Sequence, residues 1–222
     1  MKSLGVIFDM DGVLVNSYRA HLASWQRSAA ELGEQMTEPQ FASVFGRTSP
    51  DIIRDLWGRD LGDAQLAAWD DRKEAAYREI LQADFPEMDG ASELLGALHA
   101  AGFALAIGSS GPPENVELVM RCLHGAEHIA ATVNGRQVTR GKPDPQVFLA
   151  AAEKLGIAPG ACAVVEDAPA GIEAARRAGM AAIALTGTAP RDVLARRAHL
   201  VVDSLCQLTA EIVSDLILAR DE

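Results

Sequence analysis

Two aspartates directly after a short apolar segment constrain the fold of this chain most. Residues 6–8 are Val-Ile-Phe, a run typical of a buried strand, and Asp9-Met10-Asp11-Gly12 follows at once. In an open α/β sheet, ligands bind beyond the carboxyl ends of the strands, so carboxylates there are placed for chemistry. The alternative is a strand that ends in an acidic turn, because Asp-Gly alone is a common turn signal. Polar groups also follow later strands, and this favours a ligand-binding edge over a simple acidic turn.

Strand and helix patterns alternate from residue 90 onward. Short buried strands are expected at residues 103–107, 128–133, 163–165, 182–185 and 200–202. Helices are expected at residues 92–101, 113–123, 169–178 and 204–219. One more helix is expected to run to Leu155, with Asp144 as its N-cap and Pro145 at its first position. This alternation predicts an α/β fold with a mostly parallel sheet covered by helices on both faces.

A helical segment interrupts the alternation after the first strand. No strand pattern occurs between Asn16 and about Met88. Amphipathic helical spacing is found instead at residues 22–32, 37–44, 50–57 and 63–83. We therefore expect an α/β core of residues 1–15 and 89–222, and an inserted helical domain of residues 16–88 that packs over the edge of the sheet.

Charge and cysteine content exclude several classes of partner. The net charge of −11 disfavours nucleic acid and anionic membranes. No apolar run approaches the roughly 18–20 residues that a membrane-spanning helix needs, and the N-terminus lacks a signal-peptide pattern. Cys122, Cys162 and Cys206 form no CxxC pair, which favours a reduced, cytoplasmic compartment and disfavours zinc or disulfides. A monomer is the default expectation.

Polar side chains that follow the predicted strands converge on one edge of the sheet, together with a lysine that precedes a helix. They are Asp9, Asp11, Ser109, Glu166, Asp167 and Lys142. Clustered carboxylates repel one another without a cation, and oxygen ligands without histidine or cysteine favour Mg²⁺. We expect a magnesium site whose ligands come from Asp9, Glu166 and Asp167, with a backbone carbonyl near Asp11.

An aspartate beside a metal, a lysine and hydroxyl groups is the arrangement for phosphoryl transfer through an aspartyl phosphate. Asp9 would attack phosphorus. Asp11 would protonate the leaving oxygen and then deprotonate the attacking water. Ser109, Ser110 and the amides of their turn would hydrogen-bond phosphate oxygens, and Lys142 would add a point charge opposite the metal.

Four segments resemble the motifs of the haloacid dehalogenase-like superfamily. They are Phe8-Asp9-Met10-Asp11-Gly12-Val13-Leu14, Ile107-Gly108-Ser109-Ser110, Gly141-Lys142-Pro143-Asp144-Pro145 and Val165-Glu166-Asp167-Ala168-Pro169-Ala170-Gly171. Their order and spacing agree over nearly the whole chain. The helical insertion resembles the C1 cap of the β-phosphoglucomutase-like branch. The resemblance implies a Rossmann-like three-layer core, a helical-bundle cap, Mg²⁺ dependence and the roles given above.

The resemblance also separates activities within the family. Dehalogenases have no aspartate at the position of Asp11, and residues 37–56 lack the cap lysine of the phosphonate hydrolases. Five residues resemble substrate-binding cap positions of β-phosphoglucomutase: His21, Gly46, Arg47, Thr48 and Lys73. The mutase, however, has an arginine where this chain has Ser49 and a lysine where it has Pro112. These departures favour a phosphatase acting on a small phosphorylated metabolite, foremost a sugar phosphate, over a phosphomutase or a non-catalytic phosphometabolite binder.

Overall fold

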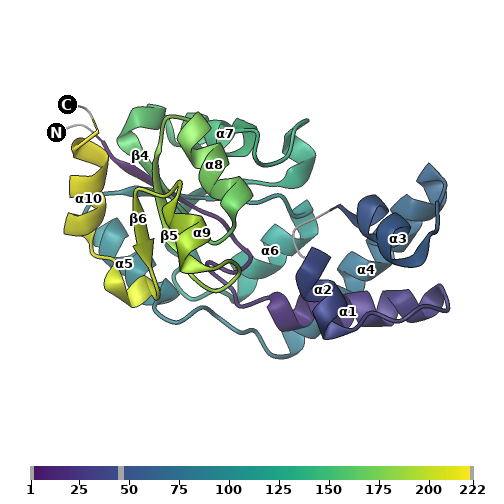
Figure 1. Ribbon diagram of the computed structural model, residues 1–222. Coiled ribbons are helices and arrows are strands. Elements are labelled where there is room, and N and C mark those ends of the chain that lie inside the picture. The colour runs from purple at the N-terminus through teal and green to yellow at the C-terminus, as the bar shows by residue number, and fades with distance from the viewer. Residues whose placement is uncertain (1–2, 45–47, 221–222) are drawn as a thin grey trace. The chain divides into compact units, whose positions relative to one another are not determined.

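The computed structural model describes residues 3–44 and 48–220, and the chain divides into two compact units (Figure 1). The core unit comprises the chain up to Asn16 and from Pro86 onward. The helical unit comprises Ser17–Phe85. These boundaries lie one to three residues from the domain limits expected from the sequence.

A parallel sheet forms the centre of the core unit. Its strands are β1 (Gly5–Phe8), β2 (Ala104–Gly108), β3 (Ile129–Val133), β4 (Cys162–Glu166), β5 (Ala181–Leu185) and β6 (Leu200–Val202). They are ordered β3-β2-β1-β4-β5-β6, and every described pairing is parallel. The strand order reverses at β1, which is where sheets of this kind bind ligands. The expected Rossmann-like α/β fold with a mostly parallel sheet is confirmed.

Helices cover both faces of this sheet (Figure 1). The α-helices of the core unit are α5 (Ala91–Ala100), α6 (Pro113–Cys122), α7 (Gln146–Leu155), α8 (Pro169–Arg177), α9 (Arg191–Ala195) and α10 (Ala210–Leu218). Short 3₁₀ helices are η1 (Ala126–His128), η2 (Gly135–Gln137), η3 (Pro159–Ala161) and η4 (Leu205–Gln207). On one face α7 and α8 pack together, and on the other α5 contacts β2 and α10 contacts β4.

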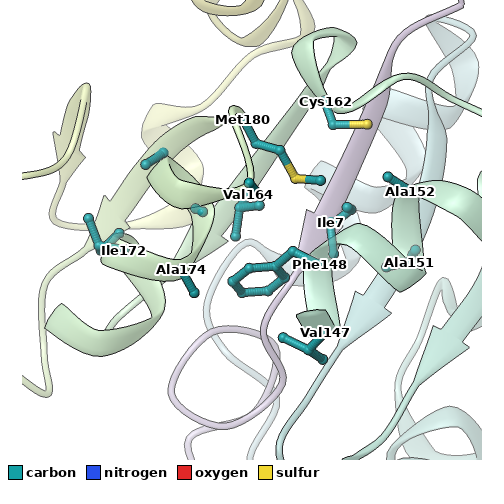
Figure 2. Packing of buried hydrophobic residues seen from close by; sticks show 14 of the residues in the cluster. Ile7, Val147, Phe148, Ala151, Ala152, Cys162, Val164, Ile172, Ala174 and Met180 are labelled. Atoms are coloured by element: carbon teal, nitrogen blue, oxygen red, sulfur yellow. The ribbon is translucent and has the colours of Figure 1, made fainter. Parts of the chain in front are cut away.

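The hydrophobic core beneath α7 and α8 explains why the strands are almost continuously apolar. Ile7 of β1 and Val164 of β4 belong to one buried cluster with Phe148 of α7 and Ile172 of α8, all of them fully buried (Figure 2). Successive strand residues point to opposite faces, so Val165 faces the other helical layer. Because helices cover both faces, apolar residues are required at nearly every strand position.

The described part of the helical unit consists of helices around a core of its own. They are α1 (Tyr18–Glu31), α2 (Glu38–Val44), α3 (Ser49–Trp57) and α4 (Asp63–Ala83). α1 and α4 pack along each other, and Trp25, Phe41, Ile53 and Trp69 are buried in the shared core. Among the described residues, no helix has both the length and the apolar content that crossing a membrane requires.

One expectation about a helix is wrong. The single helix expected at residues 204–219 is divided into η4 and α10, and α10 begins after Thr209, whose hydroxyl oxygen accepts a hydrogen bond from the Ile212 N–H at 3.2 Å. The helix expected to start at Pro145 begins one residue later, at Gln146, and the Asp144 side chain accepts from the Gln146 N–H at 3.1 Å, the hydrogen bond that an N-cap residue makes. The other expected elements of the core unit are present, with ends shifted by at most one residue.

Candidate active site

The register of the sheet brings the residues after β1 and at the end of β4 together. Phe8 pairs with Val165 of β4 and with Ile107 of β2. The N–H of Asp9 donates to the carbonyl oxygen of Val165 at 2.9 Å, which extends the ladder by one residue. Asp9 therefore lies beside Glu166, at the carboxyl edge of the sheet.

Lys142 lies between these two carboxylates. Its Nζ donates to Asp9 Oδ1 at 2.6 Å and to Glu166 Oε1 at 2.8 Å. The same Nζ lies 4.9 Å from the ring centroid of Phe148, which is part of the core under α7. Asp9 is 8% exposed and Glu166 is 1% exposed. Lys142 was expected only as a point charge opposite a metal, whereas the structure shows it as the shared partner of two buried carboxylates.

Glu166 has protein partners on both carboxylate oxygens. Oε1 accepts from Lys142, and Oε2 accepts from the N–H of Ala168 at 2.6 Å. Gly171 in the first turns of α8 leaves room for this side chain, since a Cβ at that position would lie 1.6 Å from Glu166 Oε1. This geometry directs Glu166 at Lys142, and a direct contact from Glu166 to a metal stays a prediction.

Asp167 is enclosed by residues from two other segments. The hydroxyl of Thr188, in the loop after β5, donates to Asp167 Oδ2. Gly12 lies on the other side, with a φ of +76° that favours glycine, and a Cβ there would lie 2.0 Å from Asp167 Oδ2. Asp167 is 4% exposed, so its carboxylate has little freedom to move.

Burial and mutual repulsion perturb the ionisation of the cluster. Burial, together with the charges of Glu166 and Asp11, raises the pKa of Asp9 to about 7 even though Lys142 opposes the shift. Burial and the charges of Glu166 and Asp9 likewise raise the pKa of Asp167 well above its ordinary value. Burial acts to lower the pKa of Lys142, but the carboxylates of Asp9 and Glu166 raise it. One lysine therefore does not balance the negative charge of the cluster.

The donor set fits a hard cation. Asp9, Glu166 and Asp167 each offer a carboxylate oxygen, and these oxygens lie within 4.8 Å of one another. Oxygen donors of this kind suit cations such as Mg²⁺, Mn²⁺ or Ca²⁺. A bound cation would offset the repulsion that raises the pKa of Asp9 and of Asp167.

Turns after β1 and β2 complete this edge. Ser109 is buried, its N–H donates to the carbonyl of Val133 at 3.0 Å, and its Oγ accepts from the N–H of Gly111 at 3.0 Å. Ser110 is exposed. Asp11 is partly buried, and its charge contributes to the raised pKa of Asp9. The residues that the sequence predicted in the core unit therefore all lie on the loops and strand ends of one edge.

Two candidate residues of the helical unit contact aromatic rings within that unit. The His21 ring stacks on Tyr77 with a centroid separation of 4.2 Å. Lys73 is buried, its Nζ lies 2.5 Å from Glu74 Oε1, and it lies 5.4 Å from the centroid of the Trp25 ring. Both side chains thus have well-defined partners within the helical unit.

The remaining candidates of the helical unit precede α3. Thr48 is exposed, and its hydroxyl donates to Asp51 Oδ2 at 2.7 Å across the first turn of α3. Gly46 and Arg47 lie outside the described residues. A substrate-binding role for the five candidate residues of the helical unit stays a prediction.

Sequence reasoning missed three residues that shape the cluster. Thr188 belongs to none of the four motifs, although its position just after a strand of the same parallel sheet is a signal that places it at the same edge. Gly12 and Gly171 lie within motifs, but only the three-dimensional structure shows that each makes room for a carboxylate. These residues determine where Asp167 and Glu166 point.

Comparisons with known proteins match this chain to a family. The family model described as haloacid dehalogenase-like hydrolase matches residues 4–179. Hexitol phosphatase A of Escherichia coli (strain K12) is 34% identical over 216 residues, covering 94% of this chain and 94% of the relative. The β-phosphoglucomutase of Bacillus subtilis (strain 168) is 29% identical over 217 residues, covering 95% of this chain and 93% of the relative.

A solved structure agrees with these matches. The crystal structure of a HAD hydrolase, family IA, variant 3, from Entamoeba histolytica superposes with a TM-score of 0.88 at 26% identity, covering 98% of this chain and 100% of that chain. The expected family and the expected enzyme class, a phosphatase, are confirmed. This chain belongs to the haloacid dehalogenase-like hydrolases.

Proposed function

We propose that this enzyme is a Mg²⁺-dependent phosphatase that hydrolyses a small phosphorylated metabolite, foremost a sugar phosphate, through an aspartyl phosphate on Asp9. The observation that supports this most is the buried cluster in which Lys142 joins Asp9 to Glu166 beside Asp167. A buried nucleophilic carboxylate, a fixed lysine and a set of oxygen donors are the parts that this chemistry requires.

The metal would be held by Asp9, Asp167 and the backbone carbonyl of Asp11, with Glu166 as the further candidate ligand. When bound, Mg²⁺ would neutralise negative charge on the phosphate oxygens. The chain's own contribution is to fix the donors. Asp167 is confined between Gly12 and the Thr188 hydroxyl, and these contacts determine the direction of its carboxylate.

In the first step, a carboxylate oxygen of Asp9 attacks phosphorus. A bond from Asp9 to phosphorus forms as the bond from phosphorus to the leaving oxygen breaks. The carboxyl proton of Asp11 passes to that oxygen, so the product leaves as an alcohol. A general acid of this kind contributes typically ~10²–10⁴ in rate.

In the second step, the Asp11 carboxylate takes a proton from a water molecule. The water oxygen attacks phosphorus, the bond from Asp9 to phosphorus breaks, and inorganic phosphate is released. Lys142 remains bound to Asp9 and Glu166 and offers positive charge at the site of reaction. Ser109, Ser110 and the amides of the turn after β2 would hydrogen-bond the phosphate oxygens.

We further propose that the helical domain expected from the sequence at residues 16–88 acts as a cap that selects the leaving group. His21, Gly46, Arg47, Thr48 and Lys73 are the residues that would contact it. Lys73 would have to exchange its ion pair with Glu74 for a substrate contact, since its Nζ lies 2.5 Å from Glu74 Oε1. A lid that closes over a phosphorylated substrate excludes water from the reaction.

The choice of a phosphatase over a mutase rests on two positions and on the relatives. Ser49 and Pro112 replace the arginine and the lysine that the resemblance associates with a mutase. A named sugar-alcohol phosphatase is a relative at 34% identity, compared with 29% for the named mutase. A monomer in the cytoplasm, without nucleic acid or membrane partners, remains the accompanying prediction.

The test is phosphate release from a panel of hexose, pentose, hexitol and small-acid phosphates, with Mg²⁺ and with EDTA. We expect release that depends on Mg²⁺ and is strongest for one class of sugar or sugar-alcohol phosphate. The panel includes β-glucose 1-phosphate with and without glucose 1,6-bisphosphate. Conversion to glucose 6-phosphate with little phosphate release would establish a mutase instead. Binding of phosphate esters without any turnover would establish a non-catalytic binder.

A further inference from the structure

Thr188 contacts the acidic cluster from outside the four motifs. It lies in the loop that joins β5 (Ala181–Leu185) to α9 (Arg191–Ala195), and its hydroxyl donates to Asp167 Oδ2. A hypothetical Cβ at Gly12 would lie 2.0 Å from Asp167 Oδ2 and 3.3 Å from Thr188 Oγ1. Asp167 Oδ2 therefore occupies a narrow space between the Gly12 backbone and the Thr188 hydroxyl.

The loop that presents Thr188 has its own anchors on β6 (Leu200–Val202) and on Asp203, which follows it. The N–H of Thr186 donates to the carbonyl of Val202 at 2.9 Å, and the Thr186 hydroxyl donates to Asp203 Oδ1 at 2.9 Å. Arg191 NH1 donates to the same Asp203 oxygen at 2.7 Å. These contacts fix the loop at both ends, so the position of Thr188 does not depend on Asp167.

We propose that Thr188 is a positioning residue for the metal site, whose hydroxyl fixes the orientation of the Asp167 carboxylate toward Mg²⁺. The proposal rests on the proposed function, because it assumes that Asp167 is a metal ligand. A carboxylate confined by a hydrogen bond on one oxygen loses less rotational freedom when it binds a metal. Partners of metal ligands typically contribute 10–100-fold to metal affinity.

The experiment compares matched variants by isothermal titration calorimetry with Mg²⁺ alone. Thr188→Val keeps the shape and removes the hydroxyl, Thr188→Ala removes both, and Thr188→Ser restores the donor. Thr186→Val is the control, because it removes a threonine hydroxyl from the same loop but not from Asp167, while the bonds from the Thr186 N–H to Val202 and from Arg191 to Asp203 still hold the loop. We expect the dissociation constant for Mg²⁺ to rise about 10–100-fold in Thr188→Val and Thr188→Ala. It should stay within about threefold of the wild type in Thr188→Ser and Thr186→Val, a change well below the typical effect of a ligand's partner.

Two results would overturn the proposal without touching the proposed function. One is unchanged Mg²⁺ affinity in both Thr188→Val and Thr188→Ala, and the other is an equal loss in Thr186→Val, which would indicate a general effect on the loop. Wild-type protein that binds no Mg²⁺ would overturn the proposed function and this inference together. The Mg²⁺ concentration for half-maximal phosphate release gives an independent second measurement on the same variants.

Discussion

At the scale of single residues, the site is organised by the contacts of Lys142. A lysine between two buried carboxylates is positioned by Asp9 and by Glu166 at once, and the ring of Phe148 lies beneath it. Glu166 keeps its orientation because the Ala168 N–H binds its second oxygen. A substitution that displaces Glu166 should therefore also displace Lys142, and through Lys142 it should change the surroundings of Asp9 although Asp9 is not substituted.

Gly171→Ala tests this chain of contacts. Alanine in place of glycine inside a helix normally stabilises a protein by roughly 0.5–1 kcal/mol. Here the added methyl group would lie 1.6 Å from Glu166 Oε1, so Glu166 must leave Lys142. We expect turnover to fall by about 10²-fold, the scale of a misplacement near 1 Å in an active site. Unfolding in urea should show that the free energy of unfolding falls rather than rises.

Gly96→Ala is the matched control. Gly96 lies inside α5 (Ala91–Ala100), and a Cβ there would meet no atom within 4 Å. We expect this variant to be slightly more stable than the wild type and equally active. If Gly171→Ala behaves in the same way, Glu166 does not position Lys142 as described.

The clustered carboxylates could be located from the sequence because each directly follows or ends an apolar strand. Asp9 and Glu166 lie side by side because β1 and β4 pair in parallel register. The pairing of Lys142 with Glu166 could not be predicted, because it depends on the conformation of a loop and not on a strand end. Thr188 was missed because it belongs to none of the four motifs, and only its position in the loop after β5 points to this edge.

At the scale of helices and strands, apolar spacing located the strands and most helices of the core unit, but it missed α9 and failed where a helix is divided. Leu205, Leu208, Val213 and Ile217 are all buried, with helical spacing on each side of the break and a step of five residues across it. The break is fixed by the Thr209 hydroxyl oxygen, which accepts from the Ile212 N–H. A capping threonine inside a continuous apolar pattern is a weak signal, because threonine also occurs within helices.

The junction of β5 and β6 gives a prediction about pH and stability. His199 Nδ1 accepts from the Ala182 N–H at 2.8 Å, and burial, together with the charges of Arg220 and Arg176, lowers its pKa. A lowered pKa means that folded protein binds the proton less well than unfolded protein does. His199 should therefore lower the free energy of unfolding of the wild type as the pH falls below 6.5, the ordinary pKa of histidine.

His199→Asn isolates this contribution, because asparagine retains an acceptor for the Ala182 N–H and does not titrate. We expect the melting temperature of the variant to fall less than that of the wild type between about pH 7 and pH 5. Differential scanning calorimetry at intervals of half a pH unit measures the difference. Parallel pH profiles for the two proteins would contradict the assignment of this titration to His199.

At the scale of the whole molecule, the helical unit is inserted without disturbing the sheet. The N–H of Asn16 donates to the carbonyl of Pro86 at 2.8 Å, and the N–H of Met88 donates to the carbonyl of Leu14 at 3.0 Å. The outgoing and returning segments thus lie side by side within the core unit. For this reason β1 and β2 pair in register although the whole helical unit separates them in the sequence.

The returning segment is also tied to the core unit. A carboxylate oxygen of Glu87 lies 2.9 Å from His124 Nδ1 and accepts from the His124 N–H at 3.2 Å. The sequence indicates an inserted helical segment, because strand patterns are absent between Asn16 and about Met88. The backbone hydrogen bonds between the outgoing and returning segments could not be predicted, because neither segment has the length or pattern of a strand.

The measurement that tests the central claim most directly is the trapping of phosphate on Asp9. Asp11→Asn enzyme with Mg²⁺ and para-nitrophenyl phosphate should form the aspartyl phosphate, because nitrophenolate leaves without a proton donor. It should release phosphate slowly, because the base for the attacking water is missing. After acid quenching, mass spectrometry should find one added phosphoryl group on the peptide that contains Asp9, and none in Asp9→Asn. Steady turnover by Asp9→Asn, or phosphate on another residue, would contradict the account.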